Sequence, residues 1–130
     1  MASSELVDAD IRAGRDVIAE LVEAGIPLRT ASWFHAPEFE DWRLMLATPL
    51  VRKEGPLAAY KRVMRILGRH ASTEHFPLSQ LWLVDDKDPR IDALAKFMRA
   101  SAGSEIRLRD CQVHGLFIPD ALIYGLPRSE

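Results

Sequence analysis

Two mainly apolar segments, residues 28–35 and 42–51, are separated by the polar run 36–41. This arrangement predicts a β-hairpin. Residues 42–48 carry apolar side chains at both odd and even positions, whereas a strand with one wet face alternates. We therefore expect residues 42–48 to form a strand inside a sheet, covered on both faces.

On both sides of this hairpin in the sequence, apolar residues recur at the three- and four-residue steps of amphipathic helices. The first helix is expected over residues 8–24, because Gly25 and Pro27 provide a stop signal. The second is expected over residues 56–68, with Pro56 as its first helical residue. Its buried face is predicted to consist of Leu57, Tyr60, Val63, Met64 and Leu67.

Four consecutive apolar residues, 81–84, predict a short interior strand. A third helix should follow, capped by Asp88, opened by Pro89 and closed by Gly103. The succession of strand, helix and strand in this part of the chain predicts a right-handed unit with two parallel strands. Residues 105–110 alternate between apolar and charged, which is typical of a strand with one solvated face.

The last hairpin is expected to turn at His114-Gly115 and return over residues 116–126. Since proline lacks the N–H that a ladder needs, Pro119 predicts that the return strand lies at the sheet edge with a bulge. Residues 121–124 are apolar and uncharged. An open edge of this kind pairs readily with another copy, so we expect a homodimer formed through this strand.

Together these elements predict an α+β fold of order αββαβαββ. It has one mixed sheet of about five strands, made of two hairpins and one parallel strand-helix-strand unit, and three helices. The chain of 130 residues, 48% apolar and 28% charged, has the length and balance of a single globular domain, residues 1–130.

Charge and cysteine content narrow the partners and the compartment. The formal net charge of −2 gives no overall attraction to nucleic acid or to an acidic membrane surface. Cys111 is the single cysteine, so no internal disulfide can form. No secretory pattern opens the chain, and no apolar run has the length of about 18 residues that a membrane span needs. We expect a cytoplasmic protein without a membrane partner.

An acidic loop follows the strand 81–84 and includes Asp85 and Asp86. Ligands of open α/β sheets bind at the carboxyl ends of strands, and carboxylate oxygens suit Mg²⁺. Asp85-Asp86-Lys87 also has the acid-x-lysine spacing of some nucleases, which would need an upstream acid such as Glu38, Glu40 or Asp41. The simpler interpretation, a solvated loop near a helix N-terminus, is favoured.

Residues 52–70 carry six Lys or Arg and one Glu, a net +5. Lys61, Arg65 and Arg69 recur every four residues and therefore share one side of the second helix. With Arg62, they form a candidate surface for nucleic acid or for an acidic partner. A solvated helix face that happens to be basic is the simpler alternative.

No convergent set of catalytic groups emerges from these residues. We therefore predict a small cytoplasmic protein-interaction or regulatory domain with neither catalytic activity nor a cofactor. Two alternatives stay open. One is nucleic-acid binding through the basic helix face, and the other is a Mg-dependent phosphate or nuclease-type enzyme that uses loop 85–88.

Overall fold

The computed structural model describes residues 6–35, 41–100, 105–113 and 115–125, with the backbone alone for 98–100. It confirms the predicted α+β fold with one mixed five-stranded sheet. The elements are α1 Asp8–Glu23, β1 Thr30–His35, β2 Arg43–Ala47, α2 Leu50–Glu54, α3 Pro56–Leu67, η1 Leu78–Gln80, β3 Leu81–Val84, α4 Pro89–Ala100, β4 Ile106–Val113 and β5 Leu116–Ile123.

The strands have the spatial order β3-β2-β1-β5-β4, so β2 lies between two neighbours as predicted. It pairs antiparallel with β1 and parallel with β3. The parallel pair β2–β3 is joined through α2 and α3, so the sheet contains one parallel strand-helix-strand unit. In contrast, β3 and β4, which flank α4, lie at opposite edges of the sheet and do not pair.

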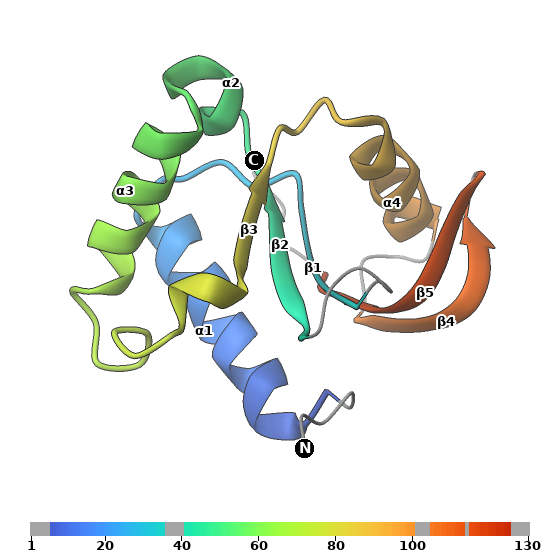
Figure 1. The fold of residues 1–130 in the computed structure, drawn as a ribbon, viewed down its shortest axis with the longest axis horizontal. Helices are drawn as coiled ribbons and strands as arrows, with labels where there is room; N and C mark the ends of the chain where they lie inside the picture. Colours follow the sequence, from blue (N-terminus) through green and yellow to red (C-terminus); the bar gives the residue numbers. More distant parts are fainter. Residues whose placement is uncertain (1–5, 36–40, 101–104, 114, 126–130) are drawn as a thin grey trace.

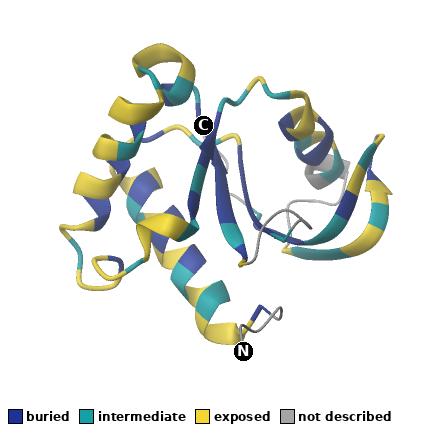
Figure 2. Cartoon of the chain, in the orientation of Figure 1, coloured by how far each residue is buried: buried dark blue, intermediate teal, exposed yellow. Residues whose placement is uncertain are grey.

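Each face of the sheet has its own apolar core. Side chains of α1 and α3 cover one face, where they pack on Trp33, Leu44 and Leu46. Helix α4 covers the other face and packs on Phe34 and Met45. Figure 1 shows β4 and β5 curving around α4, and Figure 2 shows the buried central strands between the two layers.

Two strand placements from the sequence are wrong. The all-apolar β3 lies at an edge, whereas β5 lies inside the sheet between β1 and β4. Pro119 does not force an edge position, because the ladder partners are Arg109 with Asp120 and then Cys111 with Ile118, so the proline is opposite Asp110 at a skipped pair. The predicted dimer strand thus has strands on both sides. Self-association stays a prediction, but it needs another surface.

The register of β4 and β5 is the same on both sides of this skipped pair, so no residue is inserted and the predicted bulge is absent there. Instead, Asp110 has a φ of 46°. The side chains that face α4 switch between even and odd positions at this point, so both halves of the hairpin cover the helix. These side chains are Ile106, Leu108, Cys111 and Val113 in β4, and Leu116, Ile118, Ala121 and Ile123 in β5. Of the predicted turn residues, position 114 lies outside the described residues.

Helix boundaries largely follow the sequence signals. Helix α1 ends two residues before Gly25, whose φ is 86°, and α3 begins at Pro56. The strand expected over residues 42–48 is β2, Arg43–Ala47, and it ends before Thr48, whose hydroxyl accepts the N–H of Leu50 where a short helix, α2, begins. No helix in the described ranges has both the length and the apolar character needed to cross a membrane.

The buried face predicted for α3 is partly wrong. Leu57 is 69% exposed and Met64 is 36% exposed, while Ala59 and Ile66 are buried. Helix α3 packs on α1 as well as on β3, so its contact face is rotated away from the two large apolar residues. Exposed apolar side chains therefore remain on this helix.

The charged variant Leu46→Asp should abolish folding, because Leu46 is fully buried in β2. An unpaired buried carboxylate costs several kcal/mol, comparable to the stability of about 5–15 kcal/mol of a typical domain. Circular dichroism and thermal melting measure the loss. The matched variant Leu57→Asp, at an exposed site, should melt like the wild type; a cooperative melt of Leu46→Asp would show that β2 is peripheral.

A second stability prediction concerns Gly14 on α1. A Cβ at this position would lie 2.3 Å from Tyr124 Oη and 2.8 Å from Trp33 Nε1. Gly14→Ala should therefore lower the free energy of unfolding by about 1–3 kcal/mol, despite the better helix propensity of alanine. Urea unfolding measures the change. In the double variant with Tyr124→Phe, the loss should be smaller than the sum of the single losses, and strict additivity would contradict the close approach.

Candidate functional site

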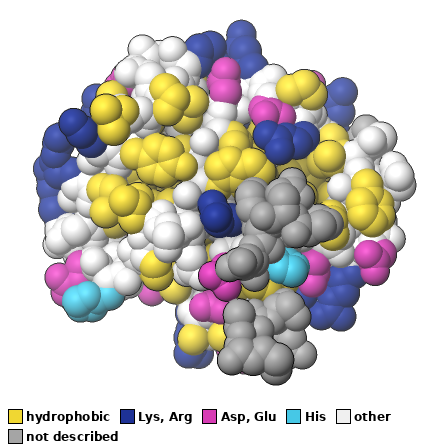
Figure 3. Space-filling view, in the orientation of Figure 1, with side chains coloured by type: hydrophobic (Ala, Val, Ile, Leu, Met, Phe, Trp, Pro, Cys, Tyr) yellow, Lys and Arg dark blue, Asp and Glu magenta, His cyan; other side chains and the backbone are white. Residues whose placement is uncertain are grey.

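The outer side of α3 carries an apolar stripe beside a cationic stripe, which together we call the α3 surface. Leu57 and Met64, seven residues apart, form the apolar stripe. Lys61 and Arg65 on α3, with Arg69 in the turn after the helix ends at Leu67, form the cationic stripe, and all three are exposed. Figure 3 shows hydrophobic side chains gathered over the side of the molecule that carries α3 and β3, with Lys and Arg along its outer margin.

The predicted basic residues differ in how their charges are balanced. Arg62 donates two hydrogen bonds to Glu54, at 3.1 and 2.9 Å, so its charge is offset within the chain. Lys61, Arg65 and Arg69 make no ion pair with any residue in the described part of the chain. Three of the four predicted cations are therefore available to an external anion.

The acidic loop after β3 is occupied by arginine. Nη1 of Arg52, from α2, donates to Asp85 at 2.5 Å and to Asp86 at 2.7 Å. Arg29 donates to the carbonyl of Asp86 at 2.8 Å and to the carboxylate of Asp92 at 2.6 Å. Two cations thus hold the loop against the end of the sheet, and they connect segments that are more than thirty residues apart in the sequence.

This arrangement leaves little for a metal ion to bind. The guanidinium of Arg52 bridges the two carboxylates on which the Mg²⁺ hypothesis rests. Within the described ranges, no three His, Cys, Asp or Glu side chains are grouped as metal ligands. Glu38 and Glu40, two of the upstream acids that a nuclease site would need, lie outside the described residues. The Mg²⁺ site at Asp85 and Asp86 stays a prediction.

Two carboxylates in this loop have altered acidity. Partial burial opposes ionisation of Asp86, but the hydrogen bond and charge of Arg52 outweigh it and lower the pKa of Asp86. The side chain of Arg90 lowers the pKa of Asp88. Asp88 also accepts the N–H of Arg90 at 2.8 Å, which confirms its predicted role as the cap of α4.

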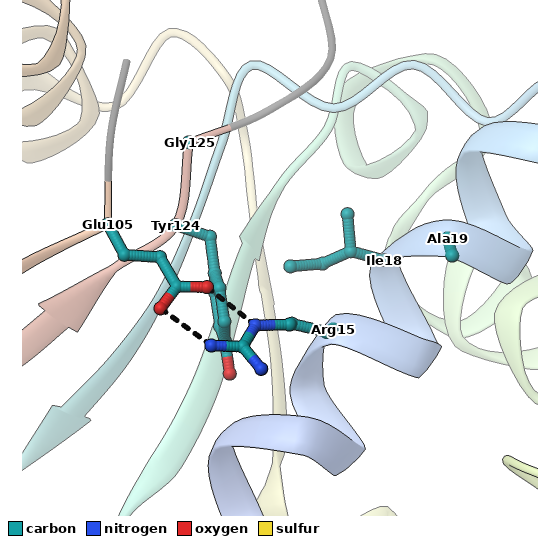
Figure 4. Close-up of a pocket in the computed structure, with 6 residues that line it drawn as sticks. All are labelled: Arg15, Ile18, Ala19, Glu105, Tyr124 and Gly125. Carbon is teal, nitrogen blue, oxygen red and sulfur yellow. Dashed lines mark hydrogen bonds and ion pairs between the residues drawn. The ribbon is translucent and has the colours of Figure 1, made fainter. Parts of the chain in front are cut away.

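A small pocket with a volume of about 210 Å³ lies between α1 and the residues that adjoin β4 and β5, which are Glu105, Tyr124 and Gly125. Figure 4 shows Arg15 reaching from α1 to Glu105, to which it donates at 2.6 and 2.9 Å. The two charged residues that line the pocket, Arg15 and Glu105, are bonded to each other. The volume is below the roughly 300 Å³ typical of small-molecule sites. The pocket is best explained as a packing groove beside this ion pair.

Sequence analysis missed a stacked cluster at the end of the β1–β2 hairpin. The rings of His35 and Trp42 stack at 5.3 Å, and the guanidinium of Arg107 lies 5.2 Å above the Trp42 ring. Asp120 accepts from Arg107 at 2.8 and 3.0 Å and fixes it there. Trp42 is only 4% exposed, so the cluster stabilises the strand ends and offers no open aromatic platform.

Comparison of the chain with protein-family models, with curated proteins and with solved structures finds no match. The functional argument therefore depends on the geometry of this chain alone. The α3 surface is the strongest candidate in that geometry, because no described residue pairs with its cations and no described element covers its apolar side chains.

The acidic loop gives a pH-dependent prediction. The lowered pKa of Asp86 means that its pairing with Arg52 stabilises the folded protein above the carboxyl's ordinary value of 3.8. That stability is lost as the pH falls through the lower folded-state pKa. Arg52→Gln should therefore flatten the decline in stability on acidification, as measured by urea unfolding across the acidic range.

Lys53→Gln is the matched control for this experiment. Lys53 is the neighbouring cation on α2, it is exposed, and it has no ion pair in the described part of the chain. Its removal should leave the acid limb of the profile unchanged. Identical profiles for wild type and Arg52→Gln would show that the pair does not affect stability.

Proposed function

We propose that this protein is a protein-interaction module that binds an acidic, partly apolar segment of another protein through the α3 surface. The observation that carries the proposal is the exposure of Leu57, at 69%, beside cations that have no partner within the described chain. Exposed apolar groups next to unpaired charges are typical of interaction sites. Catalysis has no comparable support.

The charges of the chain favour an anionic partner. The net charge is −2 overall, yet residues 52–70 carry +5. Arg52 and Arg62 are paired internally, but Lys61, Arg65 and Arg69 have no ion-pair partner among the described residues. An acidic ligand would be attracted to this helix and repelled by the remainder of the molecule, so the charges direct it to the α3 surface.

The apolar stripe favours a protein over nucleic acid as this ligand. Phosphates need cations but gain nothing from an exposed leucine. A protein segment can bury Leu57 and Met64 while its carboxylates meet Lys61 and Arg65, since the two stripes are adjacent on the helix. Binding to nucleic acid through the same cations is the second candidate, because a four-residue spacing also suits consecutive phosphates.

Binding of two probes separates these candidates. The first is a short synthetic helical peptide with leucine and glutamate on one face, and the second is a short DNA duplex. Leu57→Ser should weaken peptide binding about tenfold, because burial of a leucine side chain contributes roughly 1.5–3 kcal/mol. Fluorescence anisotropy at fixed salt measures both affinities.

Charge variants complete the test. The triple variant Lys61→Gln, Arg65→Gln, Arg69→Gln should weaken peptide binding, whereas Arg62→Gln, a matched change at an internally paired cation, should have little effect. A peptide affinity that is unchanged by Leu57→Ser would contradict the proposal. Tighter binding of the duplex, lost in the triple variant and unaffected by Leu57→Ser, would support nucleic acid instead.

A further inference from the structure

The outer edge of β3 is free in the sheet order, since β2 is its single strand neighbour in the described part of the chain. The carbonyl of Val84 accepts the N–H of Thr48, the residue after β2, at 3.0 Å, so this carbonyl points toward β2. Backbone groups in a parallel ladder alternate in direction along the strand. Leu81 and Leu83 therefore direct their N–H and carbonyl groups away from β2, toward the outer edge.

A tyrosine hydroxyl occupies this edge. Tyr60, half-buried on α3, donates to the carbonyl of Leu81 at 3.3 Å and accepts the N–H of Leu83 at 3.0 Å. In a parallel ladder, one residue of the adjacent strand makes the same two bonds, to a carbonyl and to the N–H two residues further on. The Tyr60 hydroxyl thus takes the place of one residue of a sixth strand.

The amino-acid composition of β3 is typical of an edge strand that pairs with other strands. Residues 81–84 are apolar and carry no charge, and such edges pair with other strands when their backbone groups are open. The opposite edge, β4, has Arg107, Arg109 and Asp110 along it, with a left-handed conformation at Asp110. Charge and an irregular backbone protect β4, whereas β3 depends on Tyr60.

We propose that the outer edge of β3 is a strand-pairing surface for a second copy of this chain, and that the Tyr60 hydroxyl keeps this surface closed. Two copies related by a two-fold axis would pair their β3 strands antiparallel, with the same groups of each copy meeting the other. The two sheets would then be continuous. Self-association of this protein is therefore controlled by one hydroxyl on α3 rather than by an open strand at β5.

The variant Tyr60→Phe tests the proposal, because it keeps the ring and removes only the hydroxyl. Sedimentation velocity should show wild-type monomer at concentrations where the variant is dimeric, with a dimer dissociation constant at least tenfold lower. Hydrogen exchange locates the contact. The Leu83 amide should exchange faster in the dilute variant than in the wild type, and slower when the variant is concentrated.

The chain contains two tyrosines, so Tyr124→Phe is a matched control. It also removes a hydroxyl with two hydrogen bonds, from Trp33 and to the carbonyl of Ile11, but at a site away from the β3 edge. This control should stay monomeric. If Tyr60→Phe does not melt cooperatively, Tyr60→Met removes the same hydroxyl with a good helix former.

Three results would overturn the proposal. The first is a Tyr60 variant that is folded and monomeric at the highest concentration reached. The second is equal self-association of the Tyr60→Phe and Tyr124→Phe variants, which would attribute it to lost stability. The third is a dimer in which the Leu83 amide is not protected, since its contact would then be elsewhere.

Discussion

The antiparallel pairing of β1 with β5 joins two parts of the chain that would otherwise be separate hairpins. Trp33 lies opposite Leu122 in this pair, and Tyr124, two residues later, donates its N–H to the carbonyl of Ala31 at 2.9 Å. The Tyr124 hydroxyl then binds both Trp33 and the backbone of α1. One helix and two strands distant in sequence are fixed together, and the absence of a side chain at Gly14 makes this possible.

The features that sequence reasoning predicted well are those that depend on neighbouring residues. Gly25, Pro56 and Asp88 mark helix boundaries through their own backbone preferences, and each acts near the expected position. The hairpin of β1 and β2 likewise follows from two adjacent segments. These signals act over a few residues, so they are visible in the chain before it folds.

The errors concern interactions between distant residues. Nothing near Pro119 indicates that β5 pairs with β1, because that pairing spans about ninety positions of the chain. The exposure of Leu57 depends on how α3 packs against α1, which its own periodicity does not specify. For the candidate sites, the sequence identified the acids and the basic helix. It did not show that Arg52 neutralises the acids while Lys61 has no partner among the described residues.

The surface cations therefore fall into two groups, according to whether they pair with an acid of the same chain. Cations that reach an acid within the chain, such as Arg15 and Arg52, act as cross-links between elements. Lys61 and Arg65 on α3 pair with no acid in the described part of the chain, and they adjoin the apolar side chains that the core leaves out. The same helix contributes Tyr60 to the edge of β3, so α3 lies beside both surfaces through which this molecule can meet another.

The change of parity at Asp110 has a consequence for how the last hairpin tolerates substitution. Before this residue, even positions of β4 face α4, and after it odd positions do so. A single rule of alternation applied along the whole strand would place polar side chains in the core on one side of Asp110. The hairpin is thus two short ladders in opposite phase, and each half has its own pattern of inward and outward positions.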